Sequence, residues 1–125
     1  MKIEPIYYAK TVYGKEEIDA VVKCLSESTQ MGQYSRHFEK EIAKLFQKKY
    51  GLYTNSGSSA LYLAVESLNL PAGSEVITPA LTFSTTVGSL VKNNLVPVFI
   101  DVEPLTYCID HNQIEENISP KTKAI

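Results

Sequence analysis

The sequence predicts an α/β fold in which helices pack on a mostly parallel sheet. From Leu52 to Ile100, short apolar segments rich in β-branched residues alternate with segments of helical spacing. This alternation is typical of strands joined by crossover helices. The first third of the chain instead carries two apolar stripes at helical spacing. A chain of 125 residues is long enough to bury one core.

Two helices are expected before the alternating region. The first covers residues 16–27, and four of its residues form one apolar stripe: Ile18, Val21, Val22 and Leu25. The second covers residues 35–48, with Ser35 as its N-cap. Its apolar stripe also has four members: Phe38, Ile42, Leu45 and Phe46.

The alternating region is expected to begin with a short strand at residues 50–54, which are rich in aromatic and β-branched side chains. Residues 75–78 form the next strand, which Pro79 ends because proline has no N–H group for the ladder. A helix is expected on either side of that strand. The later one covers residues 82–93, and the earlier one has an apolar series at helical spacing: Leu61, Ala64, Val65 and Leu68.

The last part of the chain is expected to contain a strand at residues 96–100 and then a loop or extended arm at residues 102–109. A short helix over residues 111–117 follows, with Asp110 as its cap and Gln113 at the capping-box position. The final residues, KTKAI, are expected to approach another strand.

The turn TNSGSSAL at residues 54–61 is the strongest functional signal. It joins an expected strand to an expected helix, so several backbone N–H groups would point at one spot. The N-terminus of a helix carries about half a positive charge, and this combination is typical of a phosphate site. The alternative is an ordinary N-cap, for which Ser and Asn are common residues.

Phe83 is the second signal, because it follows the strand at residues 75–78 and is flanked by hydroxyl side chains. The carboxyl ends of parallel strands form the edge where α/β folds place their ligands. The alternative for Phe83 is plain core packing.

These motifs resemble those of the DegT-like family of pyridoxal-phosphate-dependent sugar aminotransferases, which have fold type I. The segment NSGSSAL at 55–61 is similar to the family's phosphate turn, and GSEVITP at 73–79 with the Thr-Phe pair at 82–83 is similar to its second unit. VPVFIDV at 96–102 and SPKTKAI at 119–125 resemble its third strand and the approach to its fourth. Three earlier segments resemble the opening helices and the glycine loop between them: residues 14–18, 30–33 and 38–41.

The resemblance implies pyridoxal 5′-phosphate as cofactor. Gly57, Ser58 and Ser59 would donate backbone N–H groups to its phosphate, the serine hydroxyls would add hydrogen bonds, and Phe83 would cover one face of its ring. A glycine is expected at 57 because a tight turn and close backbone approach leave no room for a Cβ. The family's pyridine-nitrogen carboxylate, its Schiff-base lysine and a further phosphate-binding serine are expected beyond residue 125. Hence no catalytic residue and no metal are expected within the chain.

The resemblance implies transfer of an amino group from glutamate to a nucleotide-linked keto-sugar, in cell-surface polysaccharide or antibiotic sugar biosynthesis. Residues 1–125 would be the N-terminal portion of the large domain, incomplete at the C-terminus and inactive alone, and the full-length enzyme would be a homodimer. A second hypothesis is a pyridoxal-phosphate-dependent sugar 3-dehydratase of the same family, which carries histidine in place of the lysine. A non-catalytic module that binds a phosphorylated ligand and a truncated product are two further hypotheses.

Composition excludes several classes of partner. Charged residues make up 21% and the net charge is −2, so no nucleic-acid or membrane surface is expected. No apolar stretch approaches the length of a membrane span. Cys24 and Cys108 lie far apart in sequence and are expected to be buried, reduced thiols. A cytoplasmic location is therefore expected.

Several histidine, aspartate and lysine side chains are expected to have no role in the site. His37 and His111 fall on expected helices without a Ser, Cys or carboxylate partner at a telling spacing, so solvated surface is expected for both. Asp101 ends an apolar strand, and the family resemblance makes it a structural turn residue. Five lysines are expected to point to solvent, because lysine is rarely buried: Lys48, Lys49, Lys92, Lys121 and Lys123.

Overall fold

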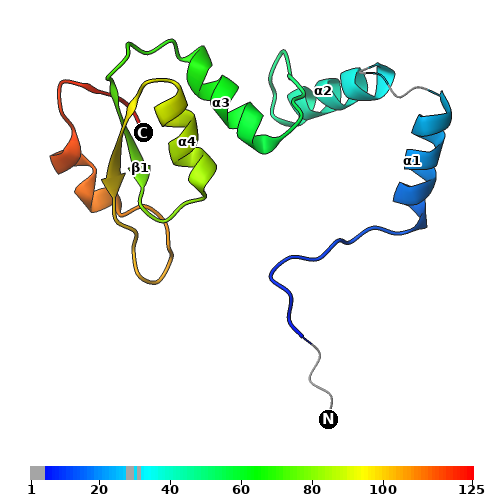
Figure 1. The fold of residues 1–125 in the computed structure, drawn as a ribbon, viewed down its shortest axis with the longest axis horizontal. Coiled ribbons are helices and arrows are strands. Elements are labelled where there is room, and N and C mark those ends of the chain that lie inside the picture. The colour runs from blue at the N-terminus through cyan, green and yellow to red at the C-terminus, as the bar shows by residue number, and fades with distance from the viewer. Residues whose placement is uncertain (1–4, 28–29, 31) are drawn as a thin grey trace. The chain divides into compact units, whose positions relative to one another are not determined.

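The structure is a computed structural model that describes residues 5–27, 30 and 32–125. It divides into two units, Met1–Tyr53 and Thr54–Ile125. Figure 1 shows the helices of the first unit in blue and cyan and the second unit from green to red. Within the described residues, no helix combines the length and the apolar character needed to cross a membrane. The expected glycine loop at residues 30–33 includes Met31, which lies outside the described residues.

The first helix, α1 (Lys15–Glu27), confirms the expected helix at residues 16–27. One half of a capping box is present at its start, because the Gly14 backbone N–H donates to the Glu17 carboxylate at 2.7 Å. This hydrogen bond lowers the pKa of Glu17 below its ordinary value. None of the residues of α1 is buried, so its apolar stripe is not covered within the described structure.

The second helix, α2 (Gln33–Leu45), begins two residues earlier than expected, and Gly32 is its N-cap. Ser35 therefore lies inside the helix, and the expectation that it caps the helix is wrong. The reason is that the Arg36 N–H already reaches the Gly32 carbonyl at 3.1 Å. The helix also stops three residues early, because Gln47 takes a left-handed backbone with φ of 53°.

Residues 50–54 do not form the expected strand. Their backbone packs along α2, where the Tyr53 N–H donates to the Glu39 carboxylate at 2.9 Å instead of to a neighbouring strand. The Tyr53 ring also meets the Phe38 ring edge-on, with 5.6 Å between centroids. Gly51 makes this approach possible, since a Cβ there would lie 2.5 Å from the Glu39 carbonyl oxygen.

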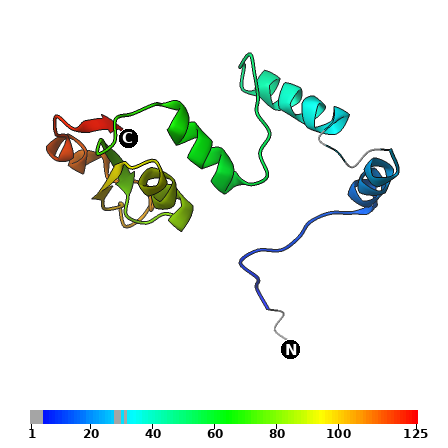
Figure 2. The same cartoon turned by 45° about the horizontal axis from the view of Figure 1, so that its top comes forward.

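The second unit contains a three-stranded parallel sheet in the order β2-β1-β3. Its strands are β1 (Glu75–Pro79), β2 (Val96–Ile100) and β3 (Thr122–Ala124), which confirm the expected strands. Two helices complete the layer: α3 (Gly57–Ser67) leads into β1, and α4 (Ser84–Lys92) connects β1 to β2. In Figure 2, β3 is the red arrow beside the C label.

The core of this unit lies where α4 crosses the sheet. Val76, Leu90 and Leu95 form a buried cluster, and Ile77 and Ile100 are the most deeply buried large side chains. Three half-buried residues pack against the cluster: Val65, Leu70 and Ala124. Burial of each large aliphatic side chain contributes about 1.5–3 kcal/mol to stability. Of the three strands, β1 contributes the most buried residues, three in succession.

The segment after β2 is a loop, as expected, and a single antiparallel bridge pairs Val102 with Ile109. The expected helix at residues 111–117 is instead two 3₁₀ turns, His111–Gln113 and Glu115–Asn117. Asp110 caps the first of them, as predicted, by accepting the Asn112 N–H.

The Gln113 side chain closes this turn differently from a capping box. Its amide donates to the Asp110 carboxylate at 2.8 Å, while the Asp110 N–H donates to the Asp101 carbonyl at 2.9 Å. The hydrogen bonds from Gln113 and then from Asn112 lower the pKa of Asp110. Asp101 also accepts the Val102 N–H on its own carboxylate, which fits the structural turn expected for it.

Candidate functional site

The N-terminus of α3 confirms the expected helix start after the Gly-Ser turn. Ser56 is the N-cap, and its hydroxyl accepts the Ser59 N–H at 3.1 Å. The Ala60 N–H donates to the Ser56 carbonyl at 3.0 Å. The first turn of a helix leaves N–H groups without an intrahelical acceptor. Of the three N–H groups predicted to bind a phosphate, that of Ser59 is already taken by the Ser56 hydroxyl, whereas those of Gly57 and Ser58 meet no acceptor among the described residues. The turn is therefore both a cap and a source of two donors.

The steric reason for a glycine at 57 is wrong as far as the chain's own atoms are concerned. A Cβ at this position would meet no atom within 4 Å. Its φ also lies outside the left-handed region, since Gly73 is the one described glycine with a positive φ. Gly57 and Ser58 are both exposed, and the space in front of their N–H groups is open to a ligand.

Phe83 lies at the start of α4 as its N-cap residue. Phe83 is 74% exposed, so within the described residues it takes no part in the core of the second unit. The chain reaches Phe83 from the carboxyl end of β1, where the Ala80 N–H donates to the Ile100 carbonyl at the end of β2. Phe83 therefore presents an exposed aromatic ring at the edge where parallel sheets place ligands.

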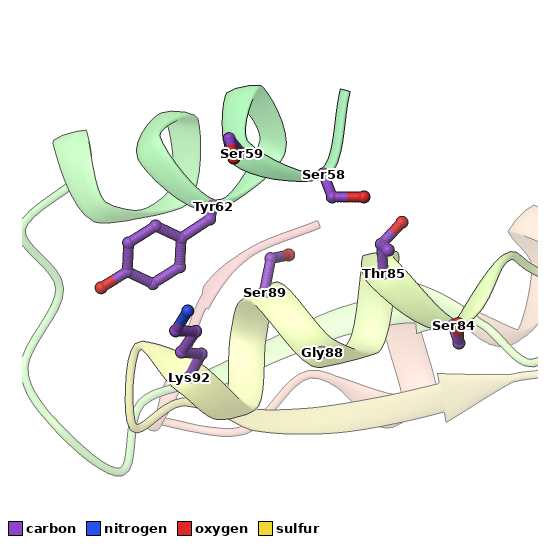
Figure 3. Close-up of a pocket in the computed structure, with 8 residues that line it drawn as sticks. All are labelled: Ser58, Ser59, Tyr62, Ser84, Thr85, Gly88, Ser89 and Lys92. Carbon is purple, nitrogen blue, oxygen red and sulfur yellow. The ribbon is translucent and has the colours of Figure 1, made fainter. Parts of the chain in front are cut away.

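A groove of about 340 Å³ runs between α3 and α4. Figure 3 shows Ser58 and Thr85 opposite each other, near the N-terminal ends of the two helices. The groove therefore includes two of the predicted site residues, Ser58 and Ser59, but not Gly57 or Phe83. Four further lining residues are small or carry a hydroxyl: Ser84, Thr85, Gly88 and Ser89. Tyr62 and Lys92 complete the lining.

Tyr62 and Lys92 form the far end of this groove, as Figure 3 shows. The Lys92 ammonium lies 4.9 Å from the centroid of the Tyr62 ring, within reach of a cation–π interaction. This groove is absent from the sequence-based expectations. The signal that indicates it is the spacing of small residues on α4 at 84, 85, 88 and 89, which places them on one helical face.

The lysines expected to point to solvent are all exposed. His111 is exposed as expected, but its expected lack of a carboxylate partner is wrong. The loop after β2 folds back, so that the Nδ1 atom of His111 lies 3.4 Å from the Glu103 carboxylate. The expectation of buried thiols is wrong for Cys108, which is exposed in the same loop, and is met only in part by Cys24, which is half-buried.

Glu103, Asp110 and His111 each offer one possible metal ligand, all within 4.8 Å of one another. Structural roles already account for these atoms. Asp110 caps the 3₁₀ turn, and Glu103 accepts the Thr106 hydroxyl at 3.1 Å and pairs with His111. We therefore assign no metal to this cluster.

Known proteins resemble the chain closely in sequence. It is 36% identical over 115 residues to 3-oxo-glucose-6-phosphate:glutamate aminotransferase of Bacillus subtilis, covering 88% of this chain and 26% of that protein. It is also 36% identical over 119 residues to the spore coat polysaccharide biosynthesis protein SpsC of the same species, covering 94% and 31%. The chain thus spans about a third or less of the length of these relatives.

A solved structure gives the same fold. GDP-4-keto-6-deoxy-D-mannose-3-dehydratase of E. coli, determined with bound hydrated pyridoxal phosphate, superposes with a TM-score of 0.86 at 32% identity. The match covers 94% of this chain and 32% of that one. The expected fold type I architecture is confirmed by this likeness. The profile of the DegT/DnrJ/EryC1/StrS aminotransferase family matches residues 12–125, and the chain belongs to this family.

Proposed function

We propose that the chain is part of a pyridoxal-phosphate-dependent enzyme that transfers an amino group from glutamate to a nucleotide-linked keto-sugar. The observation that carries the proposal is the pair of unpartnered N–H groups at Gly57 and Ser58, together with an exposed aromatic ring at the start of α4. The glutamate-dependent aminotransferase of Bacillus subtilis supports the choice of amino donor. Residues 1–125 are proposed to be the N-terminal portion of its large domain.

The residues present fit the phosphate of this cofactor. Two backbone donors, the nearby hydroxyls of Ser58 and Ser59 and the positive end of the α3 dipole suit a dianion. The side chain of Phe83 suits the face of a flat ring. When bound, the cofactor supplies an electron sink for a carbanion at the substrate carbon.

Each residue of the chain then has a simple task. Gly57 and Ser58 hold the phosphate through N–H groups that no protein acceptor uses, which fixes the position of the ring. The Ser59 N–H already donates to Ser56, so Ser59 contributes its hydroxyl and keeps the cap in place. Phe83 covers one face of the ring and excludes water from it. The amine and the carboxylate that complete the chemistry are proposed to come from residues outside 1–125.

A sugar 3-dehydratase is the second candidate, because the E. coli enzyme of that activity shares the fold with a TM-score of 0.86. The two reactions give different products. Amino transfer converts glutamate to 2-oxoglutarate and the sugar ketone to an amine, whereas the dehydratase removes a sugar hydroxyl. We propose a homodimer in the cytoplasm in either case. The thiols Cys24 and Cys108 are compatible with a reducing compartment.

The test is product analysis with the complete enzyme, pyridoxal phosphate, glutamate and a panel of nucleotide-linked 4-keto and 3-keto sugars. An amino sugar formed with an equal amount of 2-oxoglutarate is the expected result. A deoxy sugar would instead support the dehydratase, for which a histidine in place of the cofactor-binding lysine is a second check. Cofactor binding without either product would favour a binding module, and absence of cofactor binding would overturn the proposal.

The 125-residue chain itself should form no specific covalent bond with pyridoxal phosphate. Its lysines on the described surface are exposed, and none lies at a position that the family resemblance marks as catalytic. Borohydride reduction followed by mass spectrometry should give scattered, substoichiometric pyridoxyl-lysine. A single fully labelled lysine, for example Lys92 beside the groove, would show that the chain carries its own reactive amine.

A further inference from the structure

The start of α4 departs from the usual chemistry of helix caps. Phe83 occupies the N-cap position with an extended backbone, φ of −73° and ψ of 144°, and no side chain caps the helix. Ser, Thr, Asp and Asn are the residues that normally accept a first-turn N–H at this position. Phenylalanine cannot do so and is exposed here. An N-cap residue that neither caps its helix nor becomes buried departs from the local preference without a gain in stability, and such departures are typical of functional positions.

The hydroxyls of Thr82 and Thr86 form a hydrogen bond across this start. Their oxygens lie 3.0 Å apart, and they join the residue before the N-cap to the third residue of the helix. The Thr86 N–H donates to the Phe83 carbonyl at 3.0 Å. Phe83 is thus held on both sides, by a side-chain bond that spans it and by a backbone bond to its own carbonyl.

This pair differs from the capping box, in which the third helical residue reaches back to the backbone of the cap itself. Here the Thr86 hydroxyl bonds instead to the side chain of Thr82, the residue before the N-cap. The side chain of the N-cap residue, Phe83, takes no part in the pair. Thr86 lies within α4 and is half-buried, whereas Thr82 precedes the helix and is exposed. Thr86 is therefore the more firmly held partner of the hydroxyl pair. Because the allowed rotamers of a side chain depend on its φ and ψ, fixing this backbone also restricts the direction of the Phe83 ring.

We propose that Thr82 and Thr86 are positioning residues for Phe83: their hydroxyl pair fixes the start of α4 and orients the ring toward the cofactor. This inference rests on the proposed function, in which Phe83 covers the pyridine ring. The pair does not touch the ligand itself. It lowers the entropy that Phe83 would otherwise lose on binding, which is how preorganisation raises affinity.

Two variants of Thr86 separate the hydroxyl from the shape of the side chain. Thr86→Val keeps the shape and removes the hydroxyl, and Thr86→Ser keeps the hydroxyl. In the complete enzyme, Thr86→Val and Thr82→Val should each weaken the affinity for pyridoxal 5′-phosphate by about threefold to tenfold, the range of one hydrogen bond. The double variant should be no weaker than either single one, because both remove the same bond. Thr86→Ser should bind within about twofold of the wild type.

A double-mutant cycle with Phe83→Leu separates positioning from general helix stability. In the Phe83→Leu background, Thr86→Val should leave the cofactor affinity almost unchanged, because there is no ring to orient. The visible circular dichroism of the bound cofactor should change in Thr86→Val and return in Thr86→Ser. Equal losses in both backgrounds, or unchanged affinity in Thr86→Val, would overturn the inference while wild-type binding upholds the proposed function. A wild-type enzyme that binds no pyridoxal phosphate would overturn both.

Discussion

Replacing Ser58 with aspartate should weaken cofactor binding by about a hundredfold or more in the complete enzyme. The new carboxylate would face the phosphate dianion at contact distance, where like charges cost several kcal/mol in a partly dry site. Every 1.4 kcal/mol changes an affinity tenfold. The folding effect should be small and of opposite sign, because a negative charge in the first turn of a helix stabilises it by about 0.3–1 kcal/mol. Ser58 is exposed, so its replacement disturbs no core packing.

Ser67→Asp is the matched control for this charge. Ser67 lies on the same helix, but at its C-terminal end. The control adds the same carboxylate where the helix dipole disfavours it, so it should lower the unfolding midpoint slightly and leave cofactor affinity unchanged. Affinity is measured by fluorescence titration of the apo enzyme, and stability by thermal unfolding of the same sample. Unchanged affinity in Ser58→Asp would remove Ser58 from the phosphate site.

The 125-residue chain alone should self-associate or be poorly soluble, whereas the complete enzyme should be a defined dimer. The stripe on α1 is 51–64% exposed along its length, and it comprises Ile18, Val21, Val22 and Leu25. The stripe of α2 is exposed as well, from Phe38 to Phe46. Exposed apolar patches of several hundred Å² favour association. Light scattering over a range of concentrations measures the result.

A charge-matched pair of variants tests whether the stripe causes the association. Val22→Lys with Leu25→Lys adds two positive charges on the stripe and should shift the chain toward monomer. Glu16→Gln with Ala20→Lys changes the net charge by the same amount on the opposite side of α1 and should not. A folded, concentration-independent monomer of the unmodified chain would contradict the prediction and give weight to the binding-module hypothesis.

The strands of the second unit were predictable because local signals agree there. Residues 75–79 combine β-branched side chains with a terminal proline, and the structure places Val76 and Ile77 in the core. Residues 50–54 carry similar side chains but form no strand. What decides their conformation is a tertiary hydrogen bond to Glu39 and the contact with Phe38, which no local pattern reveals.

The candidate site was predictable where it depends on a single turn. The helix start at Ser56 follows from a Ser-Gly turn before an apolar series at helical spacing, although the strand expected before it does not form. The place of Phe83 between β1 and α4 follows from the order of strand, turn and helix. The groove between α3 and α4 depends on how two helices pack, so Tyr62 and Lys92 could not be paired from sequence. The partnership of His111 with Glu103 depends in the same way on a loop that folds back on itself.

The central place of β1 in the sheet sets an order in which the second unit can assemble on the ribosome. Glu75 pairs with Val96 on one side, across a single crossover helix, and with Thr122 on the opposite side, after the whole loop and both 3₁₀ turns. Pairings that are distant in sequence form late, because a longer loop must be closed first. The newly made chain can therefore join β1 to β2 while one side of β1 still has no neighbour. Until β3 emerges and the Ser119 hydroxyl reaches the Glu75 carboxylate, that edge of β1 exposes backbone N–H and C=O groups with which another chain could pair.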